Sequence, residues 1–147
     1  MTAYVTLDEC QIYFTTQRVN SSNWHYWPES ERQVAINHAT ALIDNLNFVG
    51  EKGDGELEFP RKGETTVPQA IKNACMEIAY SLLDGRDIEL DAQSISDAAT
   101  VVGPGKRQVD TRTYDAAKAH SIPSQMAWRY LLPYLNQSNT VTLSRVD

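Results

Sequence analysis

The stretch VPQAIKNACMEIAYSLLDG, residues 67–85, sets the fold of this chain. Its apolar residues recur at steps of three and one, which places them on one side of a helix with 3.6 residues per turn. This stripe consists of Ile71, Ala74, Cys75, Ile78, Ala79, Leu82 and Leu83. The opposite, polar side carries Lys72, Asn73, Glu77, Ser81 and Asp84. A stripe this wide indicates a core-forming helix, so the other segments should cover it.

Local signals mark both ends of this predicted helix. Thr66 can cap the first turn, with Gln69 able to return the bond, and Pro68 fits an early position that needs no amide donor. Gly85 supplies the left-handed residue that commonly ends a helix.

Three further segments have helical patterns. Thr6 and Glu9 form a capping box ahead of a short helix that should end near Gln17. A second helix should begin at residues 28–30, where acidic groups suit the helix dipole. Its predicted buried face is Ala35, Ile36, Ala39, Leu42, Ile43 and Leu46. A last short helix should follow residues 122–125, and Pro133 should shorten or bend it.

Length and composition indicate one globular domain. A chain of 147 residues can bury a core without disulfides or metal, and 41% hydrophobic with 22% charged residues is ordinary for such a domain. No apolar run approaches the length of a membrane span, and the N-terminus lacks a signal-peptide pattern. We therefore expect the protein to be cytosolic in the cell that makes it. Cys10 and Cys75 lie far apart without metal-ligand spacing, which predicts two buried thiols.

The formal charge of −6 argues against a protein that gains its affinity by neutralising phosphates. It is compatible with a protein that stands beside DNA and lets it slide past, because like charges discourage sticking.

The aromatic run from Trp24 to Trp27 could in principle stack on bases. Stacking surfaces usually have basic neighbours, whereas here Glu29 and Glu31 follow. We therefore predict that Trp24 and Trp27 cover one end of the core.

Three segments lack a packing face of their own. Residues 47–66 predict a mobile, solvated loop, since they match neither a calcium loop nor a phosphate-binding loop. Short β-prone runs on either side of Gly103-Pro104-Gly105 predict a hairpin over about 95–114. The residues after 136 alternate between polar and apolar side chains like a strand. Such a tail is either frayed or pairs with the edge strand of a partner protein.

Several pieces of the sequence, taken in order, are shared with a known family. They are Tyr4–Glu9, Tyr13-Phe14, Trp24, Gln33–Asp44, Phe48, Gly50, Leu57–Arg61, Val67-Pro68, Ala74–Ala79, Ile122–Ser124 and Leu131–Leu135. Together they resemble the head-to-tail adaptor (head completion, connector) proteins of tailed bacteriophages, some of whose relatives are labelled DnaT-like single-stranded-DNA-binding proteins. The resemblance spans nearly the whole chain to Leu135.

The resemblance implies a mainly α fold in a single adaptor domain, residues 1–147. A small bundle of three to four helices, about residues 5–85 and 122–135, would carry an extended β-hairpin excursion (about 95–114) and an extended C-terminal arm (136–147). Many copies, commonly twelve, would form a ring beneath the portal and around the DNA channel. This ring would close the DNA-filled head and provide the tail attachment platform.

The implied partners are the portal protein, a tail or tail-nozzle protein, identical neighbours, and double-stranded DNA that passes without sequence-specific binding. No membrane, cofactor or metal is implied, and the protein would be made in the host cytoplasm and reside at the head–tail interface of the virion. The expected portal or neighbour contacts are Thr140, Val141, Thr142, Leu143, Ser144, Arg145 and Val146. The hairpin residues expected at a neighbour or the channel are Val101, Val102, Lys106, Arg107, Val109 and Arg112.

Two other classes of function are less well matched by the sequence. A single-stranded-DNA-binding protein would need a groove that is both aromatic and basic. An enzyme would have its best candidates in His38 with Asp44, or in Cys75 as a nucleophile. Neither has spacing that suggests a catalytic hydrogen bond, so no catalytic residue is predicted.

Overall fold

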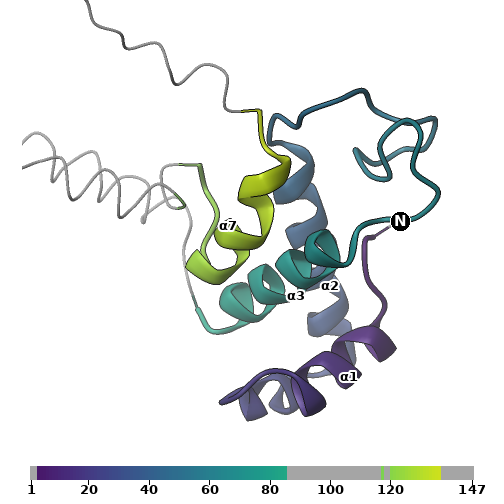
Figure 1. The fold of residues 1–147 in the computed structure, drawn as a ribbon. Coiled ribbons are helices and arrows are strands. Elements are labelled where there is room, and N and C mark those ends of the chain that lie inside the picture. The colour runs from purple at the N-terminus through teal and green to yellow at the C-terminus, as the bar shows by residue number, and fades with distance from the viewer. Residues whose placement is uncertain (1–2, 86–116, 118–119, 137–147) are drawn as a thin grey trace, which may run out of the picture.

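The computed structural model describes residues 3–85, 117 and 120–136, which form a helical body (Figure 1). The α-helices in these ranges are α1 (Leu7–Thr16), α2 (Glu29–Asp44), α3 (Gln69–Leu83) and α7 (Gln125–Leu131). Short 3₁₀ helices cover Ser22–Tyr26 and Leu132–Tyr134. None of the helices in these ranges is long and apolar enough to span a bilayer.

The described residues confirm the prediction of a mainly α fold. They contain isolated bridges, Phe48 with Leu135 and Lys52 with Arg61, but no strand. The predicted hairpin (about 95–114) lies outside the described residues and gains no support from them.

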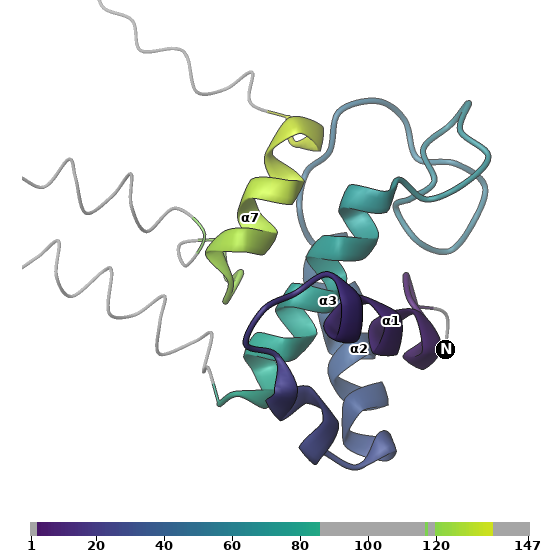
Figure 2. The ribbon, with the colours of Figure 1, turned by 60° about the horizontal axis from the view of Figure 1, so that its bottom comes forward.

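Helix α3 occupies the centre of the body, with α2 packed on one side and α7 on the other (Figures 1 and 2). Side chains of α1 contact a further side of it. As a result its buried residues, Ile71 and the run from Ala74 to Ala79, face several directions. Assigning Glu77 to the polar side was wrong: its exposed fraction is 1%, because α1 covers that side.

The predicted helix ends agree with the structure except at one position. Thr6 accepts a hydrogen bond from the Glu9 amide, and the Glu9 side chain accepts one from Thr6 N–H, which confirms the capping box. Gly85 has φ +92°, as expected for a residue that ends α3. The Thr66 cap is wrong, because Pro68 is the N-cap of α3 and makes no side-chain capping bond.

Residues 47–66 form a loop with defined anchors that the sequence analysis missed. Phe48 and Phe59 are buried, with ring centroids 4.7 Å apart. The Arg61 guanidinium donates to the Gly50 carbonyl at 2.6 Å and forms an ion pair with Glu58 at 2.8 Å. These contacts hold the loop against the end of the helical body.

The C-terminal end of the described body is tied to the same loop. The amide of Val49 donates to the Tyr134 carbonyl and the amide of Asn136 donates to the Asn47 carbonyl, both at 2.9 Å. Asn136, the first residue of the predicted arm (136–147), is thus bonded to the loop. The rest of that arm lies outside the described residues.

We predict that Ile78→Ala lowers the free energy of unfolding by about 2–5 kcal/mol, because the side chain is fully buried on α3 and its truncation leaves a cavity. Ile12→Ala on α1 is the matched control, since Ile12 is 59% exposed and its truncation should change stability by about 0.5 kcal/mol or less. Urea unfolding followed by circular dichroism measures both. Equal losses would contradict the central position of α3.

Candidate functional site

The site residues predicted from the sequence lie outside the described residues. This holds for the hairpin positions Val101, Val102, Lys106, Arg107, Val109 and Arg112, and for the arm positions from Thr140 to Val146. They remain predictions. What the structure describes is the body that would present them.

A buried charged network ties α1 to α3. The Glu77 carboxylate accepts a hydrogen bond from Tyr13 Oη at 2.6 Å and from Arg18 Nε at 2.9 and 3.1 Å. The Arg18 guanidinium also lies 4.5 Å from the centre of the Tyr80 ring. These partners compensate the loss of hydration that a buried carboxylate suffers. Because Glu77 and Arg18 are 59 positions apart, sequence spacing gave no signal for this pair.

A second polar cluster joins the N-terminal segment to the end of α2 and to the loop. Tyr4 Oη donates to the Asp44 carboxylate and accepts the Phe59 amide at 3.2 Å. The Glu58 amide also donates to Asp44, at 3.3 Å. Burial raises the pKa of Asp44 above its usual value, although its hydrogen bonds oppose this shift. Asp44 is thus held by Tyr4 and the loop rather than by His38, which lines a groove elsewhere on α2.

The basic side chains of the described body fall into two groups: Arg18, Arg32, Arg61 and Lys72 are partly buried and make polar contacts within it, whereas Lys52, Lys62 and Arg129 are exposed. Arg18 pairs with Glu77, Arg61 with Glu58, and Lys72 with Glu9 at 2.8 Å. Arg32 donates to the Trp27 carbonyl at 3.0 Å, and Lys62 lies 3.9 Å from Glu51. The exposed cations of the described residues are thus two in the 47–66 loop and one on α7, whereas binding a nucleic-acid backbone requires several cations gathered together.

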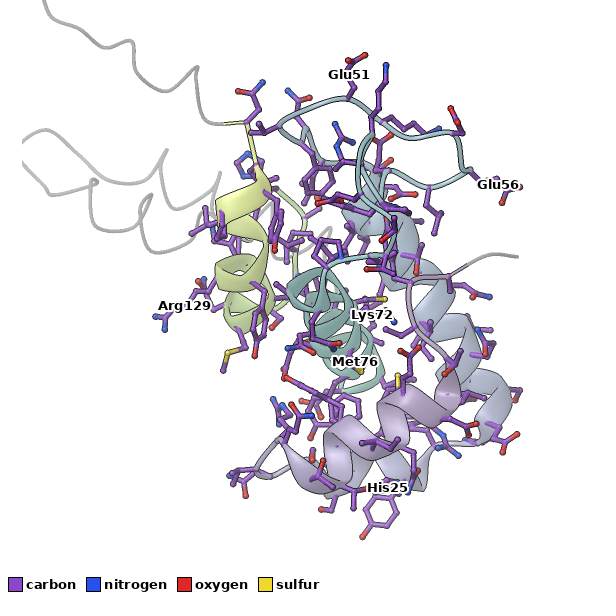
Figure 3. The ribbon with its side chains drawn as sticks, turned by 45° about the vertical axis from the view of Figure 1, so that its right-hand side comes forward. His25, Glu51, Glu56, Lys72, Met76 and Arg129 are labelled. Carbon is purple, nitrogen blue, oxygen red and sulfur yellow. The ribbon has the colours of Figure 1, made fainter. Side chains whose placement is uncertain are left out.

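Trp24 belongs to the core, as predicted, and the other rings of the aromatic run are partly or largely exposed. Trp24 is fully buried and packs on Phe14 with centroids 4.6 Å apart, while Arg32 lies 6.0 Å from the Trp24 ring. Trp27 is half-buried, and Tyr26 is 81% exposed. Figure 3 shows His25 at the outer edge of this region. The exposed rings of this region are His25 and Tyr26, and no basic side chain follows them before Arg32, which is held by the Trp27 carbonyl.

Both cysteines are buried, as predicted. Burial raises the pKa of the Cys75 thiol to about 12, although a hydrogen bond with Thr40 acts in the opposite direction. Burial also raises the pKa of the Cys10 thiol. A thiol that keeps its proton and has no exposed surface is a poor nucleophile. Among the described residues, no group of three or more potential metal ligands occurs.

An open hollow lies between the first half of α2 and the end of α3; we call it the α2–α3 groove. Its volume is about 420 Å³. It is lined by Glu31, Val34, Ala35, His38, Leu82 and Leu83. Val34, one of the lining residues, is 66% exposed. The groove is mostly apolar with an acidic residue at its rim.

We predict that Arg18→Met lowers the free energy of unfolding by about 3 kcal/mol, because it leaves the Glu77 charge buried without its cation. Lys72→Met is the matched control: it removes a cation from a partly exposed pair on the same helix and should cost at most about 1 kcal/mol. Chemical denaturation at neutral pH measures both. A smaller loss for Arg18→Met than for Lys72→Met would contradict the importance assigned to the buried pair.

Stability should fall as the pH rises above about 9, since an unfolded thiol releases its proton near pH 8.5 whereas Cys75 keeps its proton up to about pH 12. The folded state then binds more protons than the unfolded state, so unfolding becomes easier by about 1.4 kcal/mol per pH unit for each such thiol. Denaturation in reductant between pH 8 and 10 measures this slope. In the Cys75→Ala variant the unfolding free energy should fall less steeply with pH. An unchanged slope would refute the raised pKa of Cys75.

Comparison with known proteins identifies the family. A family model described as "Putative DnaT-like ssDNA binding protein" matches residues 1–146. No curated protein and no solved structure shows significant similarity to the chain. This description agrees with the DnaT-like label that some relatives of the adaptor proteins have. It does not mention an adaptor. Because the match covers almost every residue, the chain belongs to this DnaT-like family.

Proposed function

We propose that this protein is a structural virion protein, a head-to-tail adaptor whose copies form a ring under the portal. The proposal rests on the ordered sequence resemblance from Tyr4 to Leu135. The structural observation that supports it is the engagement of Arg18, Arg61 and Lys72 within the body. A body that uses its cations internally is better suited to binding proteins than to binding phosphates.

The charge balance fits a protein that surrounds DNA without holding it. The whole chain carries −6, and its acidic loop residues Glu51 and Glu56 point outward in Figure 3. A negative lining repels the phosphate backbone and lets a duplex slide. In this proposal the protein contacts the portal on one side and a tail or tail-nozzle protein on the other, commonly in twelve copies. It is made in the host cytoplasm and functions at the head–tail interface.

The proposed role requires no catalysis. The candidates that the sequence offered do not meet as a catalytic pair: Cys75 is buried and protonated, and Asp44 is held by Tyr4. The protein would act through its surfaces.

A second candidate, single-stranded-DNA binding, is favoured by the description of the family that the chain belongs to. In this case the cations would come from other parts of the chain, because those of the body are largely paired. Outside the described residues, the basic residues of the sequence are Arg86, Lys106, Arg107, Arg112, Lys118 and Arg145. Lys106 and Arg107 are adjacent, so they are the natural pair to remove.

Fluorescence anisotropy with a labelled oligothymidine separates the two candidates. The adaptor proposal predicts weak binding with little salt dependence. The second candidate predicts tight binding that falls steeply between about 50 and 200 mM salt and is weakened by Lys106→Ala with Arg107→Ala. Glu51→Ala with Glu56→Ala is the control, since it alters charge in the loop without removing a cation. Tight binding that the cation variant weakens would overturn the adaptor proposal.

Deleting residues 137–147 should leave the helical circular dichroism unchanged, because the sequence of this tail predicts no packing face of its own. The same deletion should abolish attachment to the portal if the arm makes that contact. Native mass measurement of the full-length and shortened chains, each alone and with the portal, provides the readout. Portal binding that survives the deletion would assign the contact to another part of the chain.

A further inference from the structure

The α2–α3 groove combines an apolar floor with acidic groups. Val34, Leu82 and Leu83 supply the apolar surface, and Glu31 stands one helical turn before Val34. Asp84, directly after Leu83, is exposed. An occupant of matching chemistry would present an apolar side chain with a cation close to it.

The outer face of α7 has this chemistry. Met126 is 50% exposed, and Arg129 is exposed one turn later, so the two side chains share a face. Figure 3 shows Arg129 pointing away from the helical body. Met is a flexible side chain that adapts to irregular apolar surfaces, and both Met and Arg are enriched at protein interfaces.

Other exposed apolar residues of the described body fit less well. Val19 is 79% exposed, but the neighbouring Arg18 guanidinium is committed to Glu77. Val49 is 56% exposed near Arg61, whose guanidinium is held by Glu58 and Gly50. The Met126 side chain has a nearby cation that points to solvent.

One chain cannot join these two surfaces by itself. Helices α2 and α7 lie on opposite sides of α3 (Figure 1), and the exposed face of α7 points away from α3 because Ala127, Trp128 and Leu131 face inward. Contact between the α7 face and the groove therefore requires a second copy.

We propose that the outer face of α7 of one copy docks in the α2–α3 groove of the next, with Met126 against Val34 and Leu83, and Arg129 paired with Glu31. Such a contact joins two different patches, so each copy keeps one patch of each kind available and the copies build a ring or an open chain. This inference deepens the proposed adaptor function, on which it rests, by naming the surfaces through which neighbours meet.

Charge reversal tests the pairing. Glu31→Arg and Arg129→Glu should each weaken self-association severalfold, measured by sedimentation across a concentration series. Combining both substitutions in one chain should restore it, because every junction then carries the reversed pair. Circular dichroism checks folding, which neither exposed substitution should disturb. Failure of the double variant to recover would overturn the pairing.

Cysteine crosslinking tests the contact directly, since both native thiols are buried. A mixture of Val34→Cys and Met126→Cys chains should form disulfide-linked heterodimers severalfold faster than a mixture of Val34→Cys and Ile12→Cys chains. Equal rates would overturn the inference. If rates are equal yet the chain still forms a ring with the portal, the adaptor function stands and only this interface fails. If the chain binds neither itself nor the portal but binds single-stranded DNA, the adaptor function itself fails.

Discussion

The packing of α1 against α3 depends on the buried carboxylate of Glu77, which binds Tyr13 and Arg18. Glu77 sits on α3 with 1% of its surface exposed, so it needs a cation and a hydroxyl brought to it from elsewhere in the chain. Tyr13 and Arg18 meet this need, and both belong to α1 or the turn directly after it. Apolar burial is nondirectional, whereas this network defines which residue of α1 faces which residue of α3. The position of α1 then allows Phe14 to pack on Trp24.

Elements whose signals are local could be predicted from the sequence. The capping box at Thr6, the left-handed Gly85 and the apolar stripe of α3 each depend on residues within one or two helical turns. The burial of Trp24 was also predictable, because large aromatics beside acidic neighbours favour a core over a binding surface.

Features that depend on distant residues could not be predicted. The helical pattern places Glu77 on the polar face of α3, and only the position of α1 in the folded chain explains why it is buried. The composition of residues 47–66, rich in glycine and charge, predicts a solvated loop. The contacts that anchor it, Phe59 with Phe48 and the Arg61 guanidinium with the Gly50 carbonyl, form only in the folded chain. The α2–α3 groove is formed by two helices whose separate patterns give no sign of a hollow between them.

The direction of α7 relative to α3 has a consequence for how this family can diversify. Figure 1 shows the end of α3 and the start of α7 at the same end of the body, so the chain leaves and re-enters the fold over a short span. A flexible connection between two such fixed points can lengthen at little cost, about 0.6 kcal/mol for each doubling of its length. Whatever the residues between α3 and α7 form, both of their attachment points are therefore set by packed helices. Evolution can remodel what this scaffold carries without redesigning the scaffold.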